Sequence, residues 1–330
     1  MIVNGIEMDE NSALVEKITY SQDWPIYDKS QQIEKARFME LLSDLVLEVE
    51  EPEQHKGRPR LALRDLVFAS ALKVYTQFSL RRFMSDLAFA KEKGLIDSTP
   101  CFSSVGHFME REDVTPILKR LIALSAMPLK EVETKFAIDS SGFRSSKYSQ
   151  YMRVKYHDLK AHTEHEWIKA HICCGVKTNI ITAVEITKAY GADVTQFIPL
   201  AQQTHENGFD IKEMTGDRAY SSRANLACIE ELGGTAYIPF KSNARARAGT
   251  VRLWKKMYHY FMLNREEFLQ HYHLRSNVET TFSMIKAKFS EMIKSKTQTA
   301  QTNELLLKIL CHNLVVLVEE AVRLGFMPKF

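Results

Sequence analysis

Residues 272–286, YHLRSNVETTFSMIK, decide how this chain is interpreted. Residues in a helix advance by about 100° each, so this stretch divides into two stripes of one helix. The first stripe is polar and holds Tyr272, Arg275, Glu279 and Lys286. The second stripe is apolar, extends to Phe289, and holds Val278, Phe282, Ile285 and Phe289. The pattern predicts one continuous helix that buries its apolar stripe and holds a carboxylate among basic groups at the edge of a core.

The polar stripe also has a simpler interpretation as a solvated helix face. An Arg275–Glu279 pair at i,i+4 would then contribute only about 0.3 kcal/mol. Two further acids favour a functional site, because each follows an apolar run: Asp139 in KFAIDSSGF (135–143) and Asp217 in IKEMTGDRAYSS (211–222). Three carboxylates in such settings indicate a two-metal site.

Two divalent cations bound by carboxylates suit phosphoryl transfer, since one activates the attacking oxygen and the other stabilises the leaving oxygen. In this interpretation Asp139 bridges both ions, Asp217 holds one and Glu279 holds the other. Because every ligand atom is oxygen, two Mg²⁺ ions are expected, with Mn²⁺ as a usable substitute.

A resemblance to a known family supports this interpretation. The spacing Tyr-x2-Arg-x3-Glu-x6-Lys over 272–286 resembles the signature of the YREK group of prokaryotic insertion-sequence DDE transposases. Asp139 followed by Ser-Ser-Gly, and Gly-Asp-Arg-Ala-Tyr at 216–220, look like the blocks that supply the two catalytic aspartates of that family. The resemblance covers about residues 56 to 325.

The resemblance implies an enzyme that cleaves DNA and transfers strands at the ends of an insertion sequence. It assigns the catalytic roles to Asp139, Asp217 and Glu279. It assigns the binding of phosphates at the transposon end to Tyr272, Arg275 and Lys286. Two alternatives remain open: a ribonuclease H-like nuclease without strand transfer, and a non-catalytic DNA-binding regulator or transposase relic.

The charge distribution is strongly uneven although the formal net charge is only +3. Residues 1–55 hold 4 Lys/Arg against 13 Asp/Glu, whereas 56–94 hold 9 against 3 and 241–298 hold 12 against 4. Two basic segments on a nearly neutral chain are typical of a DNA-binding surface, although ordinary solvated faces also produce them. We expect DNA, as element ends and as target, to be the partner of a homodimer, because two ends must be joined in one complex.

The cellular context follows from length and hydropathy. The chain has 330 residues, 45% of them hydrophobic, which is enough for two domains with their own cores. No apolar run approaches the roughly 18 residues of a membrane span, and the first residues lack a basic region followed by an apolar one. We expect a cytoplasmic, nucleoid-associated prokaryotic protein with no membrane partner and no small-molecule substrate.

The chain divides into an acidic segment (1–55) with one helix at 31–50, a helical region (56–130) and a catalytic domain (131–330). In the helical region, helices are expected at 62–77, at 80–93 after an N-cap at Ser79, from Ser103 or Ser104 to 110, and from Thr115 to 127. The first two are compatible with a helix-turn-helix-like DNA-binding module, and also with a commoner small bundle. Arg81 and Arg82 begin the second helix and are candidate DNA contacts.

From residue 135 the pattern changes to short apolar runs. Strands are expected at 136–138 (ending at Asp139), 167–176, 180–187, 211–215 and 236–239, and helices at 194–205 after Asp193 and from Ser221 or Ser222 to 232. This order predicts an α/β, ribonuclease H-like mixed sheet. The first strand of that fold lies beside the fourth, which makes Asp139 and Asp217 neighbours.

The interval before the long helix, 241–271, interleaves bases with aromatic residues. Such a mixture can bind distorted DNA by charge and stacking, so the candidate contacts here are Arg245, Arg247 and Trp254. Packing of Trp254 in a core is the alternative. Five cysteines without paired CxxC spacing exclude a zinc ribbon, and only a cluster of His157, His162, His165 and His171 leaves a remote zinc alternative.

Overall fold

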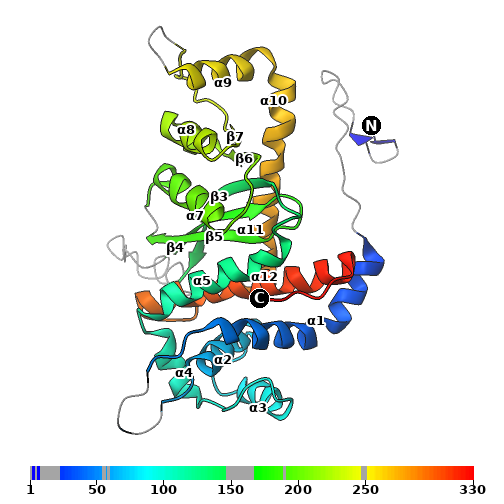
Figure 1. Ribbon diagram of the computed structural model, residues 1–330, viewed down its shortest axis with the longest axis vertical. Coiled ribbons are helices and arrows are strands. Elements are labelled where there is room, and N and C mark those ends of the chain that lie inside the picture. The colour runs from blue at the N-terminus through cyan, green and yellow to red at the C-terminus, as the bar shows by residue number, and fades with distance from the viewer. Residues whose placement is uncertain are drawn as a thin grey trace.

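A computed structural model of the 330-residue chain describes residues 2–3, 6–7, 23–53, 57, 60–145, 167–188, 191–246 and 251–330. The molecule is an elongated stack (Figure 1): a helical layer at one end, a mixed sheet in the middle, and α8 and α9 at the other end. Near the N-terminus, β1 (Ile2–Val3) pairs antiparallel with β2 (Ile6–Glu7).

The central sheet has five strands in the order β5-β4-β3-β6-β7. Their bounds are Lys135–Arg144 (β3), Trp167–Gly175 (β4), Ile181–Lys188 (β5), Glu213–Gly216 (β6) and Thr235–Tyr237 (β7). β3, β4 and β5 form an antiparallel meander, whereas β6 and β7 run parallel to β3. The predicted ribonuclease H-like arrangement, with the first long strand beside the fourth, is confirmed.

The prediction that the first strand ends at Asp139 was wrong, because β3 continues to Arg144. Along one edge β3 pairs with β4 over its whole length after Lys135, and the pair Asp139↔Ile172 lies within that ladder. Along the other edge the parallel ladder with β6 ends at Ile138↔Gly216. Asp139 therefore lies in a continuous strand but at the point where its neighbour turns away.

Helices cover both faces of the sheet. α7 (Phe197–Glu206) packs on β4 and β5, and α8 (Arg223–Glu231) packs on β7. Ser222 caps α8 as predicted, since its hydroxyl accepts the N–H of Asn225 at 3.1 Å. Asp193 does not cap the expected helix; it begins a 3₁₀ turn, η3 (Asp193–Gln196), and its carboxylate accepts hydrogen bonds from Ser140 and Lys169.

The helical layer is built around the C-terminal helix. Its members are α1 (Trp24–Leu45), α2 (Leu63–Thr76), α3 (Met84–Glu92), α4 (Phe102–Met109), α5 (Val114–Ala126) and α12 (Gln298–Leu324). α12 packs against α1, α2, α4 and α5, and also contacts β4 and β5 (Figure 1). The helical region therefore shares its core with the end of the chain, and its boundary at residue 130 remains a prediction.

Several helix starts differ from the sequence expectation because other groups cap them. α1 begins at Trp24, seven residues early, since the Asp23 carboxylate accepts the N–H of Ile26 and proline follows in the first turn. α3 begins at Met84 rather than at 80, although Ser79 does accept the N–H of Arg82. α4 begins at Phe102 after Cys101, and α5 begins at Val114 after Asp113, so the expected caps at 103–104 and 115 lie inside these helices.

Two asparagines of α12 fasten this helix, one to the sheet and one to the rest of the helical layer. Asn313 is fully buried; its amide donates to the carbonyls of Ile181 and Ile122 and accepts the N–H of Ile181 at 2.9 Å. Asn303, also buried, donates to the carbonyls of Met109 and Arg111. A buried amide with its hydrogen bonds satisfied specifies one arrangement of the elements that it joins.

Replacing Asn313 with Leu should lower the free energy of unfolding by about 2–4 kcal/mol, because the backbone groups of Ile181 stay buried without their partners. Urea denaturation at an unchanged m-value measures the loss. Thr302→Ala, at a half-buried position of the same helix, is the control and should shift stability by no more than about 0.5 kcal/mol. Equal midpoints for Asn313→Leu and the wild type would contradict the prediction.

Candidate active site

Arg275 joins two of the three predicted catalytic carboxylates. Its Nη2 donates to Oδ2 of Asp139 at 3.1 Å, and its Nη1 donates to Oε1 of Glu279 at 2.7 Å. The i,i+4 pair expected for a solvated helix is thus present, but the same guanidinium also reaches across to β3. A single cation therefore lies between the central strand and the helix that carries Glu279.

Asp217 approaches from the neighbouring strand. It is the first residue after β6, and its Oδ1 accepts the N–H of Ala219 at 2.8 Å, which caps the 3₁₀ turn η4 (Arg218–Tyr220). Asp139 is held in a similar way, since its Oδ1 accepts the N–H of Ser140 at 2.8 Å. Each aspartate therefore has one oxygen bound to the N–H of a residue that follows it in the chain. The second oxygen binds Arg275 in Asp139 and is available to a ligand in Asp217.

The other two acids both act electrostatically on Asp139. Burial raises the pKa of Asp139, and the negative charges of Asp217 and Glu279 raise it further, while the Ser140 N–H and Arg275 oppose the rise. Unlike Asp139, whose side chain is 16% exposed, Glu279 is 58% exposed. The site thus combines one sheltered carboxylate with one that can reorient in solvent.

The predicted continuous helix over 272–286 was wrong in one respect. α10 (Arg265–Tyr272) ends in a 3₁₀ turn, η5 (His273–Arg275), and α11 (Ser276–Phe289) begins after it. Tyr272 lies on the far side of this turn, half-buried, with its ring 6.1 Å from that of His273. Tyr272 therefore ends one helix, whereas Glu279 and Lys286 lie on the next.

Lys286 reaches β3 two residues beyond Asp139. Its Nζ donates to the hydroxyl of Ser141 at 2.8 Å and lies 5.2 Å from the centre of the Phe143 ring. Burial lowers the pKa of this lysine. Because alternate residues of a strand share a face, Asp139, Ser141 and Phe143 all point toward α11, and Arg275 and Lys286 bind the same face of β3.

The opposite face of β3 carries a polar cluster that sequence reasoning missed. The Ser140 hydroxyl donates to Asp193 at 3.1 Å; Asp193 also pairs with Lys169 and lies 3.5 Å from Nδ1 of the fully buried His171. Burial raises the pKa of the Tyr220 phenol, and Asp139, Asp193 and Asp217 raise it further. The alternation of strand residues places Ser140 opposite Asp139, but nothing in the sequence names Asp193 as its partner.

The candidate DNA contacts lie at two separate places. Arg81 and Arg82 are exposed on the turn before α3, with their guanidinium carbons 4.8 Å and 4.7 Å from the ring centres of Phe102 and Phe78. In the other region, α9 (Arg252–Leu263) is strongly amphipathic. Trp254 of α9 packs edge-on against Phe240 at 4.7 Å and donates to the Arg245 carbonyl, whereas Arg247 lies outside the described residues.

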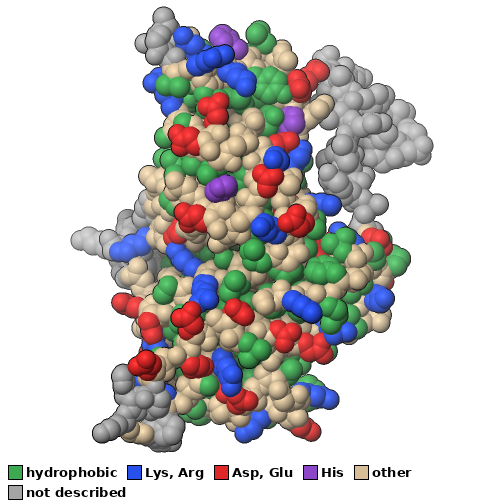
Figure 2. Space-filling view, viewed as in Figure 1, with side chains coloured by type: hydrophobic (Ala, Val, Ile, Leu, Met, Phe, Trp, Pro, Cys, Tyr) green, Lys and Arg blue, Asp and Glu red, His purple; other side chains and the backbone are tan. Residues whose placement is uncertain are grey.

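Lysines and arginines gather at the end of the molecule formed by α8 and α9 (Figure 2). The exposed members are Arg218, Arg223, Lys241, Arg245, Arg252 and Lys256. Within the described part of the chain, none of these six forms an ion pair with an acid. This basic surface begins at Arg218, the residue after Asp217, and extends along α9.

The donor atoms suit a divalent metal, although the present arrangement is not yet a metal cage. In the described ranges, no three Asp, Glu, His or Cys side chains are close enough together to hold an ion. The three acids nevertheless supply only oxygen ligands, repel one another, and hold a positive charge, Arg275, between two of them. Their chemistry and their need for a cation fit a divalent metal ion.

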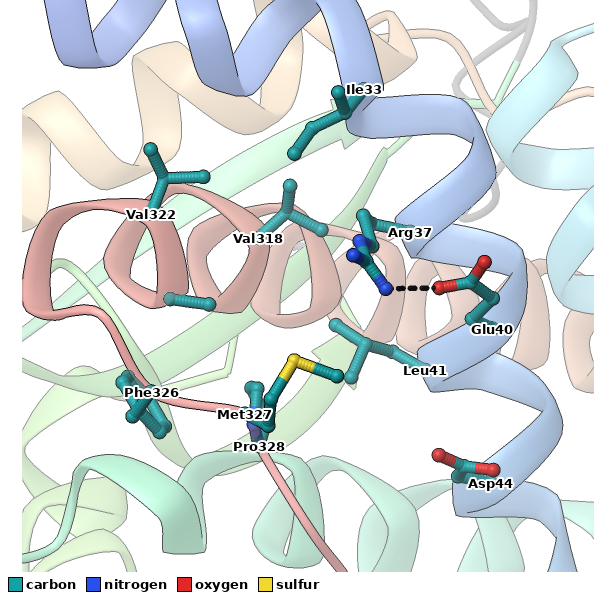
Figure 3. A pocket seen from close by; sticks show the side chains of 11 residues that line it. Ile33, Arg37, Glu40, Leu41, Asp44, Val318, Val322, Phe326, Met327 and Pro328 are labelled. Carbon is teal, nitrogen blue, oxygen red and sulfur yellow. Dashed lines mark hydrogen bonds and ion pairs between the residues drawn. The ribbon is translucent and has the colours of Figure 1, made fainter.

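Two other candidate sites are less suited to chemistry. A cavity of about 160 Å³ lies between α1 and the end of α12, lined by Ile33, Leu41, Val318 and Phe326 (Figure 3); none of the three acids lines it.

The zinc alternative rests on four histidines. One of them, His171, bonds to the Thr187 hydroxyl at 2.8 Å. His157, His162 and His165 lie outside the described residues, and no described helix is long and apolar enough to cross a bilayer.

The fold and the site define a class: a ribonuclease H-like protein with acids where the ladder of two adjacent parallel strands ends and on a later helix. The family model described as "Transposase DDE domain" matches residues 130–314, more than half of the chain. The chain belongs to this family and is a DNA-cleaving transposase, as the resemblance implied. Enzymes of this family generally use divalent metal ions.

Two further comparisons complete the picture. A cryo-EM structure of a piggyBac transposase synaptic complex with hairpin DNA is 12% identical, with a TM-score of 0.43, covering 89% of this chain and 74% of that one. No curated protein sequence matches the chain. The family assignment therefore rests on the family model.

A buried lysine fastens the end of α11 to α12. The Lys308 side chain is 3% exposed; its Nζ donates to the carbonyls of Ser290 and Met292 at 2.8 and 2.6 Å and lies 3.9 Å from Glu304. Glu304 in turn accepts the N–H groups of Lys294 and Ser295. These bonds fix the segment that follows the Glu279 helix.

Burial lowers the pKa of Lys308 from 10.5 to about 8. Between these values the unfolded chain holds a proton that the folded chain lacks, so this group adds stability as the pH rises through the window. Lys308→Met should remove this increase in stability with pH. Unfolding free energies measured below pH 8 and at about pH 10 test this. Lys296→Met, at an exposed position, should leave it unchanged; an identical pH profile for Lys308→Met would refute the assignment.

Proposed function

We propose that this transposase cleaves and rejoins DNA at the ends of an insertion sequence of the YREK group, with Asp139, Asp217 and Glu279 as the catalytic residues. The observation that carries the proposal is the convergence of these acids beside β3, within the matched segment. Two Mg²⁺ ions, replaceable by Mn²⁺, would activate the attacking oxygen and stabilise the leaving oxygen when bound.

The roles of the three acids follow from their positions. The Asp139 side chain is 16% exposed against 58% for Glu279, and both Asp217 and Glu279 raise its pKa, which suits a ligand shared by both ions. Asp217 keeps one oxygen on the Ala219 N–H and offers the other. Glu279 is exposed on α11 and can turn inward without disturbing the core, because the apolar side of α11 holds the helix in place.

The basic groups beside the acids would bind the phosphates of the transposon end. A guanidinium can grip a phosphate through two parallel hydrogen bonds, which suits Arg275, whereas Lys286 would act as a point charge after leaving the Ser141 hydroxyl. Tyr272 would donate from its phenol at the edge of this group. Tyr272, Arg275 and Lys286 would together bind the phosphates beside the acids.

The rest of the DNA would follow the basic surface on α8 and α9. That surface begins beside Asp217, and its bases have no acidic partners within the described ranges. Arg245 and Trp254 belong to it; the Trp254 indole is partly buried against Phe240, so it would offer an edge rather than a whole face. Because two ends must be processed together, we infer that the protein acts on DNA as a homodimer in a prokaryotic cytoplasm.

Glu279→Gln should reduce Mg²⁺-dependent nicking of a labelled duplex taken from the DNA that flanks the gene by at least about 10³-fold, since a neutral amide is a poor metal ligand. Binding of that duplex should persist. Glu266→Gln, an exposed acid at the start of α10, is the matched control and should cleave normally. Normal nicking by Glu279→Gln would exclude Glu279 from the site.

The helical layer makes a separate contribution if it reads the element ends. α2 is buried along most of its length, so the exposed turn before α3 is the part that can reach DNA. Arg81→Ala with Arg82→Ala should weaken end binding about tenfold or more at low salt, because two phosphate or base contacts are lost. Gel-shift titration measures this. Arg37→Ala with Arg323→Ala is the control for lost charge, and unchanged end binding by the first pair would remove the assignment.

A further inference from the structure

Arg275 is committed to two incompatible tasks. In the structure its guanidinium holds Oδ2 of Asp139 and Oε1 of Glu279. In the proposed function those same oxygens bind metal ions, and the same guanidinium binds a DNA phosphate. Both sets of bonds cannot be made at once, because one donor group and two acceptor oxygens are shared between them.

We propose that Arg275 is a charge gate that makes metal binding depend on DNA. In the DNA-free protein it neutralises Asp139 and Glu279 and competes with divalent cations for their oxygens. A DNA phosphate draws the guanidinium away, which frees both carboxylates. The inference rests on the proposed function, because it assumes that these acids are the metal ligands.

The geometry allows the guanidinium to leave. Its bond to Glu279 is made to a side chain that is 58% exposed, so solvent screens the pair. Its Nε is buried and has no hydrogen-bond partner among the described residues, so the present position leaves one donor unsatisfied. Arg275 is also the last residue of η5, at the junction with α11, where the side chain starts from a helix end rather than from a packed helix interior.

The electrostatics make departure and metal entry a coupled exchange. Without Arg275, the buried Asp139 would face the charges of Asp217 and Glu279 with only the Ser140 N–H opposing them. The site therefore needs a cation at all times, and the exchange replaces one with another. By reciprocity, metal ions that bind the freed acids must tighten DNA binding by the same factor.

The gate has a chemical benefit. Two-metal sites activate water as readily as a DNA hydroxyl, so a site that fills only on DNA limits unwanted hydrolysis elsewhere. A phosphate can displace the guanidinium from the acids, since two phosphate oxygens can replace the two carboxylate contacts with matched bidentate geometry. Lys286, held by the neutral Ser141 hydroxyl, is not part of the gate, because it occupies no carboxylate oxygen.

The test measures the affinity of the full chain for Mn²⁺, from the EPR signal of the free ion. It is done without DNA and with a duplex of the DNA that flanks the gene, whose strands end in 3′-dideoxy nucleotides. We expect the duplex to tighten Mn²⁺ binding by the wild type about tenfold or more. Arg275→Gln should bind Mn²⁺ more tightly than the wild type without DNA, and DNA should change its affinity little. Lys135→Gln, which also loses one positive charge from β3 but has no role in the site, should retain the weak DNA-free binding of the wild type.

Equal Mn²⁺ affinity of the wild type with and without the duplex would overturn the gate while leaving the metal site intact. The gate would also be overturned if folded Arg275→Gln, verified by circular dichroism, bound Mn²⁺ without DNA no more tightly than the wild type does. If Arg275→Gln and Lys135→Gln raise the Mn²⁺ affinity equally, the effect is one of net charge only, and the gate is overturned as well. No Mn²⁺ binding by the wild type even on DNA would instead contradict the proposed function, as would full binding by Asp139→Asn.

Discussion

The parallel ladder between β3 and β6 ends one residue before both aspartates, and the site depends on that divergence. While the strands pair, up to Ile138↔Gly216, their backbones satisfy each other. Once β6 turns away, Asp139 and Asp217 lie side by side at an open edge, each with one oxygen on a local backbone N–H. α11 then brings Glu279 to the same edge, because its apolar residues are buried beside β3 and β4.

Bringing three acids together is unfavourable, and the structure offsets this with Arg275. The guanidinium binds a carboxylate on each side, while burial raises the pKa of Asp139 and the charges of Asp217 and Glu279 raise it further. The packing of α12 holds these repelling groups in place. Asn313 and Asn303 join α12 to the sheet and to the helical layer, and Lys308 joins α12 to the end of α11. The helix with the third acid is therefore held at both its apolar face and its C-terminal end.

Where the sequence expectation was wrong, local pattern competed with a partner far along the chain. Asp193 looks like a helix cap, yet Lys169 and Ser140 bind it because η3 packs over the far face of β3. β3 outlasts its apolar run because β4 pairs with it as far as Arg144↔Trp167. The 3₁₀ turn at His273–Arg275 breaks a helix that periodicity alone makes continuous. For Asp193 and for β3, the deciding contact joins residues that no short window contains.

The sequence by itself determined the element order and the ribonuclease H-like α/β class, which follow from periodicity over a few turns of chain. The resemblance of its motifs gave the family and the prediction of the three acids with their basic neighbours. Only the tertiary structure decided that Arg275 bridges Asp139 and Glu279, that Lys286 binds Ser141, and that α12 is the core of the helical layer. Each of those contacts depends on the direction of a side chain relative to a distant backbone, and that direction is set only when the sheet and helices pack together.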